Sequence, residues 1–259
     1  MTADYQKMEY IGLIDIPLVE VKDDIAEIIL YNARRHNLKI FANDIIIITQ
    51  KIISKSESRL RDLRSVEPSR KAIGIAKKAG KDPRLVQLIL NESEEVMRVR
   101  KGLIITRHKN GFVCANAGID HSNTVQGDIE QNMVLLLPED ADRSARLIRD
   151  KIQEQTGKKV GVIIIDSHGR AWRNGTIGTT IGIAGVPGVV DLRGQEDLFG
   201  YKLRATFVAA ADELAAGASL LMGQANEQIP VVIARGFPYP LRESSLNELI
   251  RLKKNDLFQ

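Results

Sequence analysis

Short, uninterrupted hydrophobic runs are the clearest pattern in this chain. The two longest are Ile45-Ile-Ile-Ile-Thr49 and Val160-Gly-Val-Ile-Ile-Ile165, and both consist largely of β-branched residues. Runs of this length and composition predict strands that are covered on both faces. Val231-Val-Ile-Ala234 predicts another buried strand, and Tyr10-Ile-Gly-Leu-Ile14 predicts a short one.

Other segments repeat their hydrophobic residues every three or four positions, which is typical of helices with one buried face. Asp23 and Asp24 are expected to start the first of these helices. Pro83 suits the first position of a helix, whereas Gly80 and Gly157 suit helix ends. The remaining predicted helices cover residues 69–79, 83–96, 140–155, 211–222 and 244–254. In the 140–155 helix, the predicted buried side comprises Leu147, Ile148 and Ile152.

A glycine-rich stretch, residues 175–188, does not fit the helical pattern. Its β-branched residues argue against a helix, and its glycines permit another group to approach the backbone closely. The approaching group could be a ligand or a neighbouring strand, and the sequence favours neither.

Two acidic residues follow predicted strands. Asp166 comes directly after the run 160–165 and precedes Ser-His-Gly, which can turn the chain outward. Asp120 lies in a polar loop of small residues after the apolar segment 102–106. Carboxylates at strand ends are well placed to hold a hard cation. For Asp166 the alternative is an Asx-turn that only ends the strand.

The sequence does not decide the roles of the lysines and histidines near these acids. Lys51 and Lys55 are predicted to lie in a polar loop after the strand 45–49, where they could contact phosphate or remain solvated. His121 and His168 follow the two acids, and each could face solvent in a loop, contact substrate or transfer a proton. The polar stretch 223–230 is well placed to offer carbonyls and amides to a ligand.

Composition narrows the class of protein. With 259 residues and 44% hydrophobic content, the chain can bury a sizeable core. Its formal charge of +4 is spread among interleaved acids and bases without a basic stripe, so we expect no nucleic-acid partner. Cys114 is the single cysteine, which excludes an intrachain disulfide and favours a reducing cytoplasm. No run approaches eighteen apolar residues, so no membrane association is expected.

Common nucleotide and metal motifs are missing. Residues 74–82 come nearest to a P-loop, but the glycine spacing is one residue too long and Asp82 replaces the hydroxyl. The histidines include no H-x-x-x-H pair, which makes zinc hydrolysis a poor explanation.

Several motifs together resemble the coenzyme F-420 gamma-glutamyl ligase family. They are Ile16-Pro-Leu-Val19, Ile53-Ser-Lys-Ser-Glu57, Val113-Cys-Ala-Asn-Ala-Gly-Ile-Asp-His-Ser-Asn123, Val160-Gly-Val-Ile-Ile-Ile-Asp-Ser-His-Gly-Arg170 and Leu220-Leu-Met-Gly-Gln224. The resemblance covers nearly the whole chain in order. It implies a GTP-dependent ligase that joins L-glutamate to the lactyl carboxylate of coenzyme F-420-0 through an acyl phosphate. It also implies two Mg²⁺ or Mn²⁺ ions, often with K⁺.

The fold implied by the resemblance is a mixed α+β arrangement, with mixed sheets and helices in two interwoven lobes. Residues 1–259 would form a single domain without a flexible linker, and the protein would be a homodimer. The implied metal ligands are Asp120, Asp166, Ser167 and Gln224. The implied GTP-binding residues are Ile16, Pro17, Leu18, Val19, Gln50, Lys51, Lys55, Asn123, Met222, Gly223, Gln224, Ala225, Asn226, Glu227, Gln228 and Ile229. Lys55, Asp120 and Asp166 are expected to act in catalysis.

The chain departs from the family pattern in places. Many relatives have Ser or Thr where this chain has Gln50-Lys51, and an acid can replace Gln224. The main alternatives are a nucleotide-dependent glutamate ligase acting on another acceptor, such as a folate-like compound, and a non-catalytic homologue that only binds nucleotide or metal.

Overall fold

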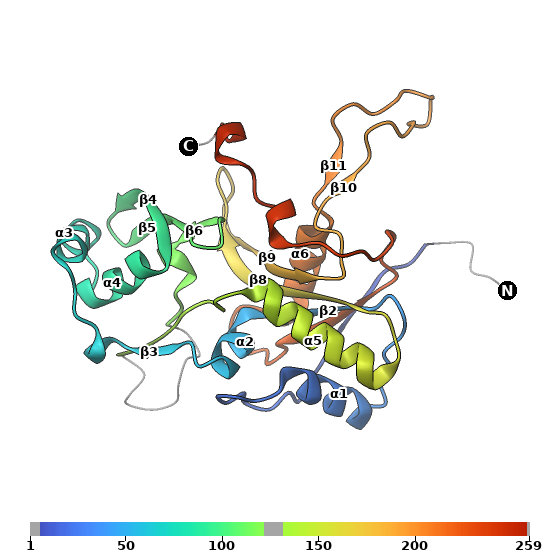
Figure 1. Ribbon diagram of the computed structural model, residues 1–259, viewed down its shortest axis with the longest axis horizontal. Coiled ribbons are helices and arrows are strands. Elements are labelled where there is room, and N and C mark those ends of the chain that lie inside the picture. The colour runs from blue at the N-terminus through green and yellow to red at the C-terminus, as the bar shows by residue number, and fades with distance from the viewer. Residues whose placement is uncertain (1–5, 122–131, 258–259) are drawn as a thin grey trace.

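A five-stranded sheet in the order β1-β12-β2-β8-β9 forms the centre of the computed structural model (Figure 1), which describes residues 6–121 and 132–257. Its strands are β1 Glu9–Gly12, β2 Ile45–Thr49, β8 Gly161–Gly169, β9 Thr176–Ala184 and β12 Val231–Arg235. β2 and β8 are parallel, and the other neighbouring pairs are antiparallel. The predicted α+β fold with mixed sheets is confirmed.

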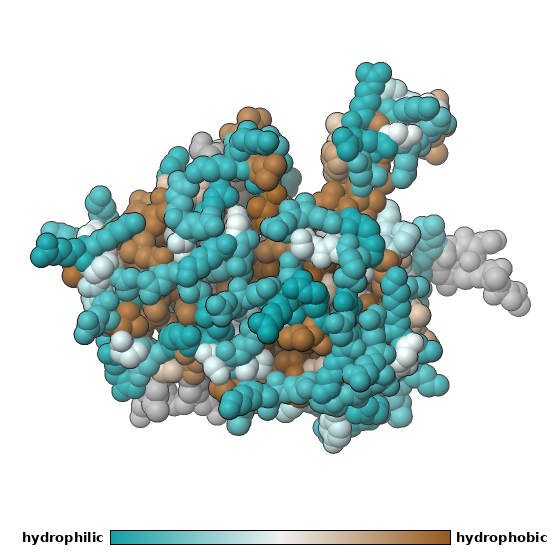
Figure 2. All heavy atoms as spheres, viewed as in Figure 1, coloured by the Kyte–Doolittle hydropathy of each residue, from teal (hydrophilic) through white to brown (hydrophobic). Residues whose placement is uncertain are grey.

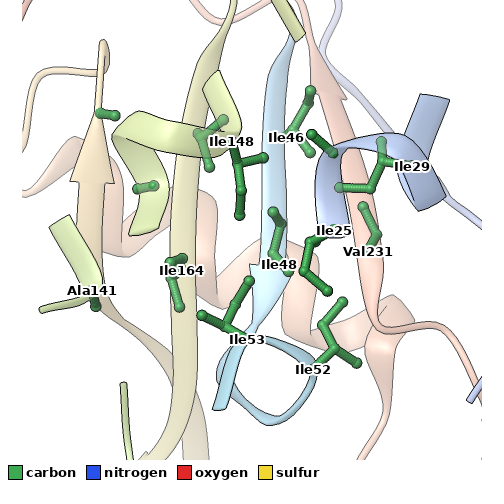
Figure 3. Packing of buried hydrophobic residues seen from close by; sticks show 14 of the residues in the cluster. Ile25, Ile29, Ile46, Ile48, Ile52, Ile53, Ala141, Ile148, Ile164 and Val231 are labelled. Atoms are coloured by element: carbon green, nitrogen blue, oxygen red, sulfur yellow. The ribbon is translucent and has the colours of Figure 1, made fainter. Parts of the chain in front are cut away.

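Helices cover both faces of this sheet. α1 Ile25–Arg35, α2 Gln50–Ser56 and α5 Ala141–Thr156 pack on one face, as Figure 3 shows, and α6 Ala210–Met222 packs on the other. Because successive side chains of a strand point to opposite faces, Ile46 and Ile48 join the first core and Ile45 and Ile47 the second. All four isoleucines are fully buried, which explains why the run carries no polar residue.

β9 passes very close to helices on both sides. A Cβ atom added at Gly182 would lie 2.5 Å from the carbonyl oxygen of Ala141 in α5. A Cβ atom added at Gly178 would lie 2.4 Å from the carbonyl oxygen of Ala215 in α6. At these two glycines the approaching group is therefore a helix, and neither of the predicted alternatives describes it.

A second lobe is formed by residues 60–121 and 132–136, between α2 and α5 in the chain. The paired strands β3 Leu60–Asp62 and β7 Met133–Leu135 carry the chain out and back. The lobe itself contains α3 Arg70–Ala79, α4 Pro83–Asn91, β4 Ser93–Arg100, β5 Leu103–His108 and β6 Val113–Ala115. Its separate core includes Leu63, Ala72, Val86, Ile89 and Ile104.

A hairpin arm, residues 190–208, projects from the body of the molecule (Figures 1 and 2). It starts and ends with the short paired strands β10 Val190–Asp191 and β11 Phe207–Val208. Among the described residues, no helix has the length and apolar character needed to cross a bilayer.

The predicted helix ends are largely confirmed. Asp24, Ser69 and Asp140 each accept a backbone N–H in the first turn of the helix that follows. Gly80 and Gly157 end their helices with φ of 62° and 66°, a left-handed conformation that costs glycine little.

Two of the helix predictions were wrong in extent. The helix predicted over 83–96 ends at Asn91, because the following residues pair with β5 as strand β4. The segment 244–254 contains no α-helix, and its helical parts are the short 3-10 helices Leu246–Glu248 and Lys253–Asn255. In α5, Ile148 and Ile152 are buried as predicted, but Leu147 is 62% exposed.

Two predicted loops are regular elements instead. Gln50 to Lys55 form most of α2, because Ile52 and Ile53 bury their side chains against the sheet. Ser167 to Gly169 continue β8, because β9 folds back beside them and pairs as far as Gly169 with Thr176.

Candidate functional site

Most of the predicted site residues gather at one edge of the central sheet, where β2 ends. β8 runs parallel to β2, so Asp166 lies at the same edge as the residues that follow Thr49. β12 is antiparallel to β2 and begins there, with the Thr49 amide donating to the Pro230 carbonyl at 2.9 Å. β1 is antiparallel to β12 and ends there. The segments that meet at this edge are 13–19, 50–56, 165–166 and 222–230.

Asp166 is held rigidly within β8. The strand continues to Gly169, which rules out an Asx-turn that ends it at Asp166. The Oδ2 atom of Asp166 lies 3.1 Å from Nε2 of His168, two residues along on the same face. The two side chains are only 14% and 9% exposed. His168 is therefore a buried partner of the carboxylate, and the prediction of a solvent-facing loop is wrong for it.

Aromatic packing holds His168 in place. The Phe112 ring lies 5.3 Å from the His168 ring, and its other neighbour is His108 at 4.9 Å in a stacked arrangement. Burial lowers the pKa of His108 to about 4, so this ring stays neutral near pH 7. Burial, and then the charge of Asp166, raise the pKa of Cys114 to about 12, which keeps the thiol unreactive. Phe112 and His108 were not predicted to belong to this site, because Phe112 reaches β8 from the other lobe and His108 stacks on Phe112.

Asp120 is positioned by a strained turn. Asn116, Ala117 and Gly118 all have positive φ, of 51°, 54° and 66°. Left-handed backbone costs about 1–2 kcal/mol for a non-glycine residue, so the surrounding structure must enforce it. The Asn116 side chain accepts the Ile104 amide at 3.2 Å, and the turn leads to a bridge between Asp120 and Leu135.

Lys51 and Lys55 project from α2 beside this turn. The Lys51 ammonium lies 2.9 Å from Oδ2 of Asp120. Burial, and then the charge of Lys51, lower the pKa of Lys55. Gln50 and Ser54 are buried and joined by a 2.9 Å hydrogen bond, and among the described residues nothing accepts from the Gln50 Nε2 atom.

Backbone amides of the loop 222–229 bind a carboxylate of the loop itself. The carboxylate of Glu227 accepts the Ala225 amide at 2.8 Å, and these backbone contacts lower the pKa of Glu227. Gly223 has φ of 67°, and a Cβ atom there would collide with the Glu227 carboxylate. The exposed residues of this loop are Gln224, Ala225, Asn226, Glu227 and Gln228.

The other predicted site residues are less closely associated with Asp166. Strand alternation places the exposed Ser167 side chain on the opposite face of β8. Ile16 to Val19 form an extended segment in which Leu18 is 75% exposed and Val19 is buried. Asn123 lies outside the described residues.

The acids at this edge suit a hard divalent ion that arrives with a nucleotide. Asp120 and Asp166 supply the carboxylate oxygens that Mg²⁺ and Mn²⁺ prefer. Within the described ranges, no group of three His, Cys, Asp or Glu side chains gathers at one point. Mg²⁺ is commonly held by one or two carboxylates together with phosphates and water, so this sparse set fits such an ion. The Lys51 ammonium on Asp120 shows that this carboxylate already accepts a cation.

Comparison with known proteins gives a consistent result over the whole chain. A family model described as F420-0:Gamma-glutamyl ligase matches residues 13–236. A Methanococcus maripaludis protein named Coenzyme F420:L-glutamate ligase is 46% identical, and the alignment covers 100% of both chains. Proteins of the same name from Methanocaldococcus jannaschii and Archaeoglobus fulgidus are 44% and 40% identical, covering 100% and 98% of this chain and 100% and 97% of their own lengths. The matched range includes every segment that meets at the sheet edge.

Proposed function

This chain belongs to the F420-0:gamma-glutamyl ligase family, and we propose that it uses GTP to join L-glutamate to the carboxylate of coenzyme F420-0. The observation that carries the proposal is the convergence of 13–19, 50–56 and 222–230 around Asp166 at one sheet edge. These segments hold most of the residues that the family resemblance assigns to nucleotide and metal.

The chemistry requires activation of a carboxylate, which is a poor electrophile. Transfer of the γ-phosphoryl group from GTP to the acceptor carboxylate would give an acyl phosphate and GDP. Attack by the glutamate amine would then form the amide and release phosphate. The protein's part is positioning and charge neutralisation, for which Lys51 and Lys55 supply the positive charges.

Divalent ions would be held by Asp120 and Asp166, and when bound they would offset negative charge on the phosphoryl group. In the tautomer with a proton on Nε2, His168 donates to the Asp166 carboxylate and restrains it. Removing the metal with a chelator is therefore expected to stop ligation while leaving the fold intact.

The decisive experiment measures the mass of the product formed from GTP, Mg²⁺ or Mn²⁺, L-glutamate and F420-0. We expect a mass increase of one or more glutamyl groups, and a higher kcat/KM with GTP than with ATP. Equal efficiency with the two nucleotides would overturn the GTP preference alone. Glutamylation of a folate-like acceptor, or no product with any acceptor, would support one of the alternatives instead.

Replacing Lys55 with Ala should raise KM for GTP by about tenfold or more, since a hydrogen bond to a charged phosphate contributes about 1.5–3 kcal/mol. Thermal stability should stay the same or rise, because the substitution removes a half-buried charge. The control is Lys78→Ala, an exposed lysine of α3 in the other lobe. If the two variants have the same KM for GTP, Lys55 does not contact the nucleotide.

We also propose a homodimer in which the hairpin arm contacts a second copy. Leu198 and Phe199 are 97% and 94% exposed on the arm, and Phe207 is 52% exposed. Large exposed apolar groups on a projecting element mark interaction sites. Sedimentation equilibrium should give twice the chain mass, and Phe199→Asp should shift the protein towards monomer. A wild-type mass of one chain would contradict the proposal.

A further inference from the structure

A cleft of about 220 Å³ lies beside β9, the edge strand of the central sheet. Its walls come from the second lobe, the start of α6 and the C-terminal segment, and they include Arg107, Phe112, Thr179, Thr180, Asp212 and Leu249. Pockets for drug-sized ligands measure about 300–1,000 Å³. The cleft is therefore suited to a ligand the size of an amino acid.

Arg107 lines this cleft, and part of its guanidinium group has no hydrogen-bond partner among the described residues. The residue is 9% exposed, and one nitrogen, Nη1, donates to the Gly111 carbonyl at 3.1 Å. Its Nε and Nη2 atoms are buried and have no partner among residues 6–121 and 132–257. Glu95, its cross-strand partner in β4, pairs with Lys253 at 2.8 Å instead. Leaving charged donors buried and unpaired is costly, which points to a ligand that completes them.

The unpaired nitrogens are the ones that hold a carboxylate elsewhere in this chain. Arg64, Arg84 and Arg193 each use Nε and Nη2 to bind both oxygens of one aspartate. These two N–H groups form one edge of the planar guanidinium group, and their spacing matches a carboxylate. In Arg107 the same edge has no partner within the described ranges.

The cleft also contains groups that suit an amine. Asp212 lies in the first turn of α6, and its Oδ1 atom accepts the Thr180 amide at 3.0 Å. A carboxylate can accept several hydrogen bonds, so Asp212 can also accept from a ligand. The Thr180 hydroxyl is buried next to this carboxylate and stabilises its charge. A carboxylate and a hydroxyl can both accept from an ammonium group.

We propose that this cleft is the L-glutamate subsite, in which Arg107 binds a carboxylate of the amino acid and Asp212 and Thr180 bind its amino group. The inference rests on the proposed ligase function. Thr179 is the cross-strand partner of Asp166, and Phe112 packs on His168, so the cleft adjoins the acidic site. An amine held there would lie close to a carboxylate activated beside Asp166.

Arg107→Met tests the carboxylate half. We expect KM for L-glutamate to rise by about ten- to a hundredfold, the loss typical of a charged bidentate pair, while KM for GTP and for F420-0 stays unchanged. Arg100→Met, an exposed arginine of β4, is the matched control. A rise in KM for GTP or F420-0 alone would assign Arg107 to that substrate and overturn the proposal. Three unchanged KM values would also overturn it.

Calorimetric binding of L-glutamate and glutarate to the full chain tests the amine half without turnover. Asp212→Asn keeps an acceptor for the Thr180 amide, and it should weaken glutamate binding about tenfold while leaving glutarate, which lacks the amine, unaffected. Equal effects on both ligands, or on neither, would contradict the assignment of the amine.

These measurements separate the two proposals. If the wild type binds L-glutamate through Arg107 but forms no F420 product, the ligase function fails and the subsite stands. If it forms product and Arg107→Met leaves both glutamate KM and glutamate binding unchanged, the subsite fails and the function stands. Should Arg107→Met lower the melting temperature, Arg107→Lys keeps the charge but loses the planar fork, and it must then raise glutamate KM.

Discussion

Asp166→Asn should lower ligase activity by about a hundredfold or more while the protein remains folded. A loss of that size corresponds to about 2.7 kcal/mol of transition-state stabilisation, which is reasonable for removing a charged metal ligand. The neutral amide has nearly the same shape as the carboxylate, so it can occupy the same position in β8.

The structure indicates that stability should be unchanged or slightly higher in this variant. The Asp166 side chain is 14% exposed, and its one hydrogen bond within the described residues is to His168. Asparagine can keep that bond through either tautomer of the imidazole. Removing a largely buried charge also removes its desolvation cost.

Measuring melting temperature and metal-titrated turnover on the same preparation tests this prediction. The control is Asp150→Asn, an acid of α5 that is 60% exposed and paired with Arg149 at 2.7 Å, which should behave like the wild type. A folded Asp166→Asn protein with near-normal turnover at low metal would show that Asp166 does not hold the catalytic cation.

Gly182→Ala should destabilise the protein by about 3 kcal/mol, near the upper end of the usual cost of overpacking a core. The added methyl group would lie 2.5–2.6 Å from the C, O and Cβ atoms of Ala141. Two of these atoms belong to the backbone of α5, so neither a rotamer change nor a small shift can relieve the contact. The helix and the edge strand would have to separate, which opens the core between them.

Thermal unfolding gives the measurement, and we expect a fall in melting temperature of roughly 6–12 °C for a chain of this size. Gly169→Ala is the control, because a Cβ atom there meets no heavy atom within 4 Å in the same hairpin. A Gly182→Ala variant as stable as this control would mean that α5 does not pack as closely on β9 as described.

Local patterns were enough to predict many elements of the fold. The all-isoleucine run of β2 could be recognised because a strand buried on both faces has no position for a polar residue. The caps Asp24, Ser69 and Gly157 could be recognised because they satisfy backbone groups within a few residues. The end of α4 could not be predicted, because pairing with β5 decides it. The conformation of 244–254 could not be predicted either, because its packing on the rest of the protein decides it.

In the candidate site, too, the residues could be predicted from the sequence but their arrangement could not. Asp120, Asp166 and the lysines of α2 could be proposed from the sequence, because charged residues beside apolar runs stand out locally. Their arrangement could not be derived from spacing alone, since Asp120 meets Lys51 only because the second lobe returns beside α2. His168 was misjudged for the same reason, because Phe112, which packs on it, comes from the other lobe.

The sequence by itself determined the elements that satisfy their own requirements over short distances: the buried strands, the helix starts and stops, and the motifs that carry the family resemblance. Only the tertiary structure decided which side chains share an environment. Gly182 meets a helix, His168 is buried beside Asp166, and Arg107 lies in a cleft with two unpaired nitrogens. These facts depend on contacts between residues far apart in the chain, and such contacts arise from packing whole elements together, which no local pattern encodes.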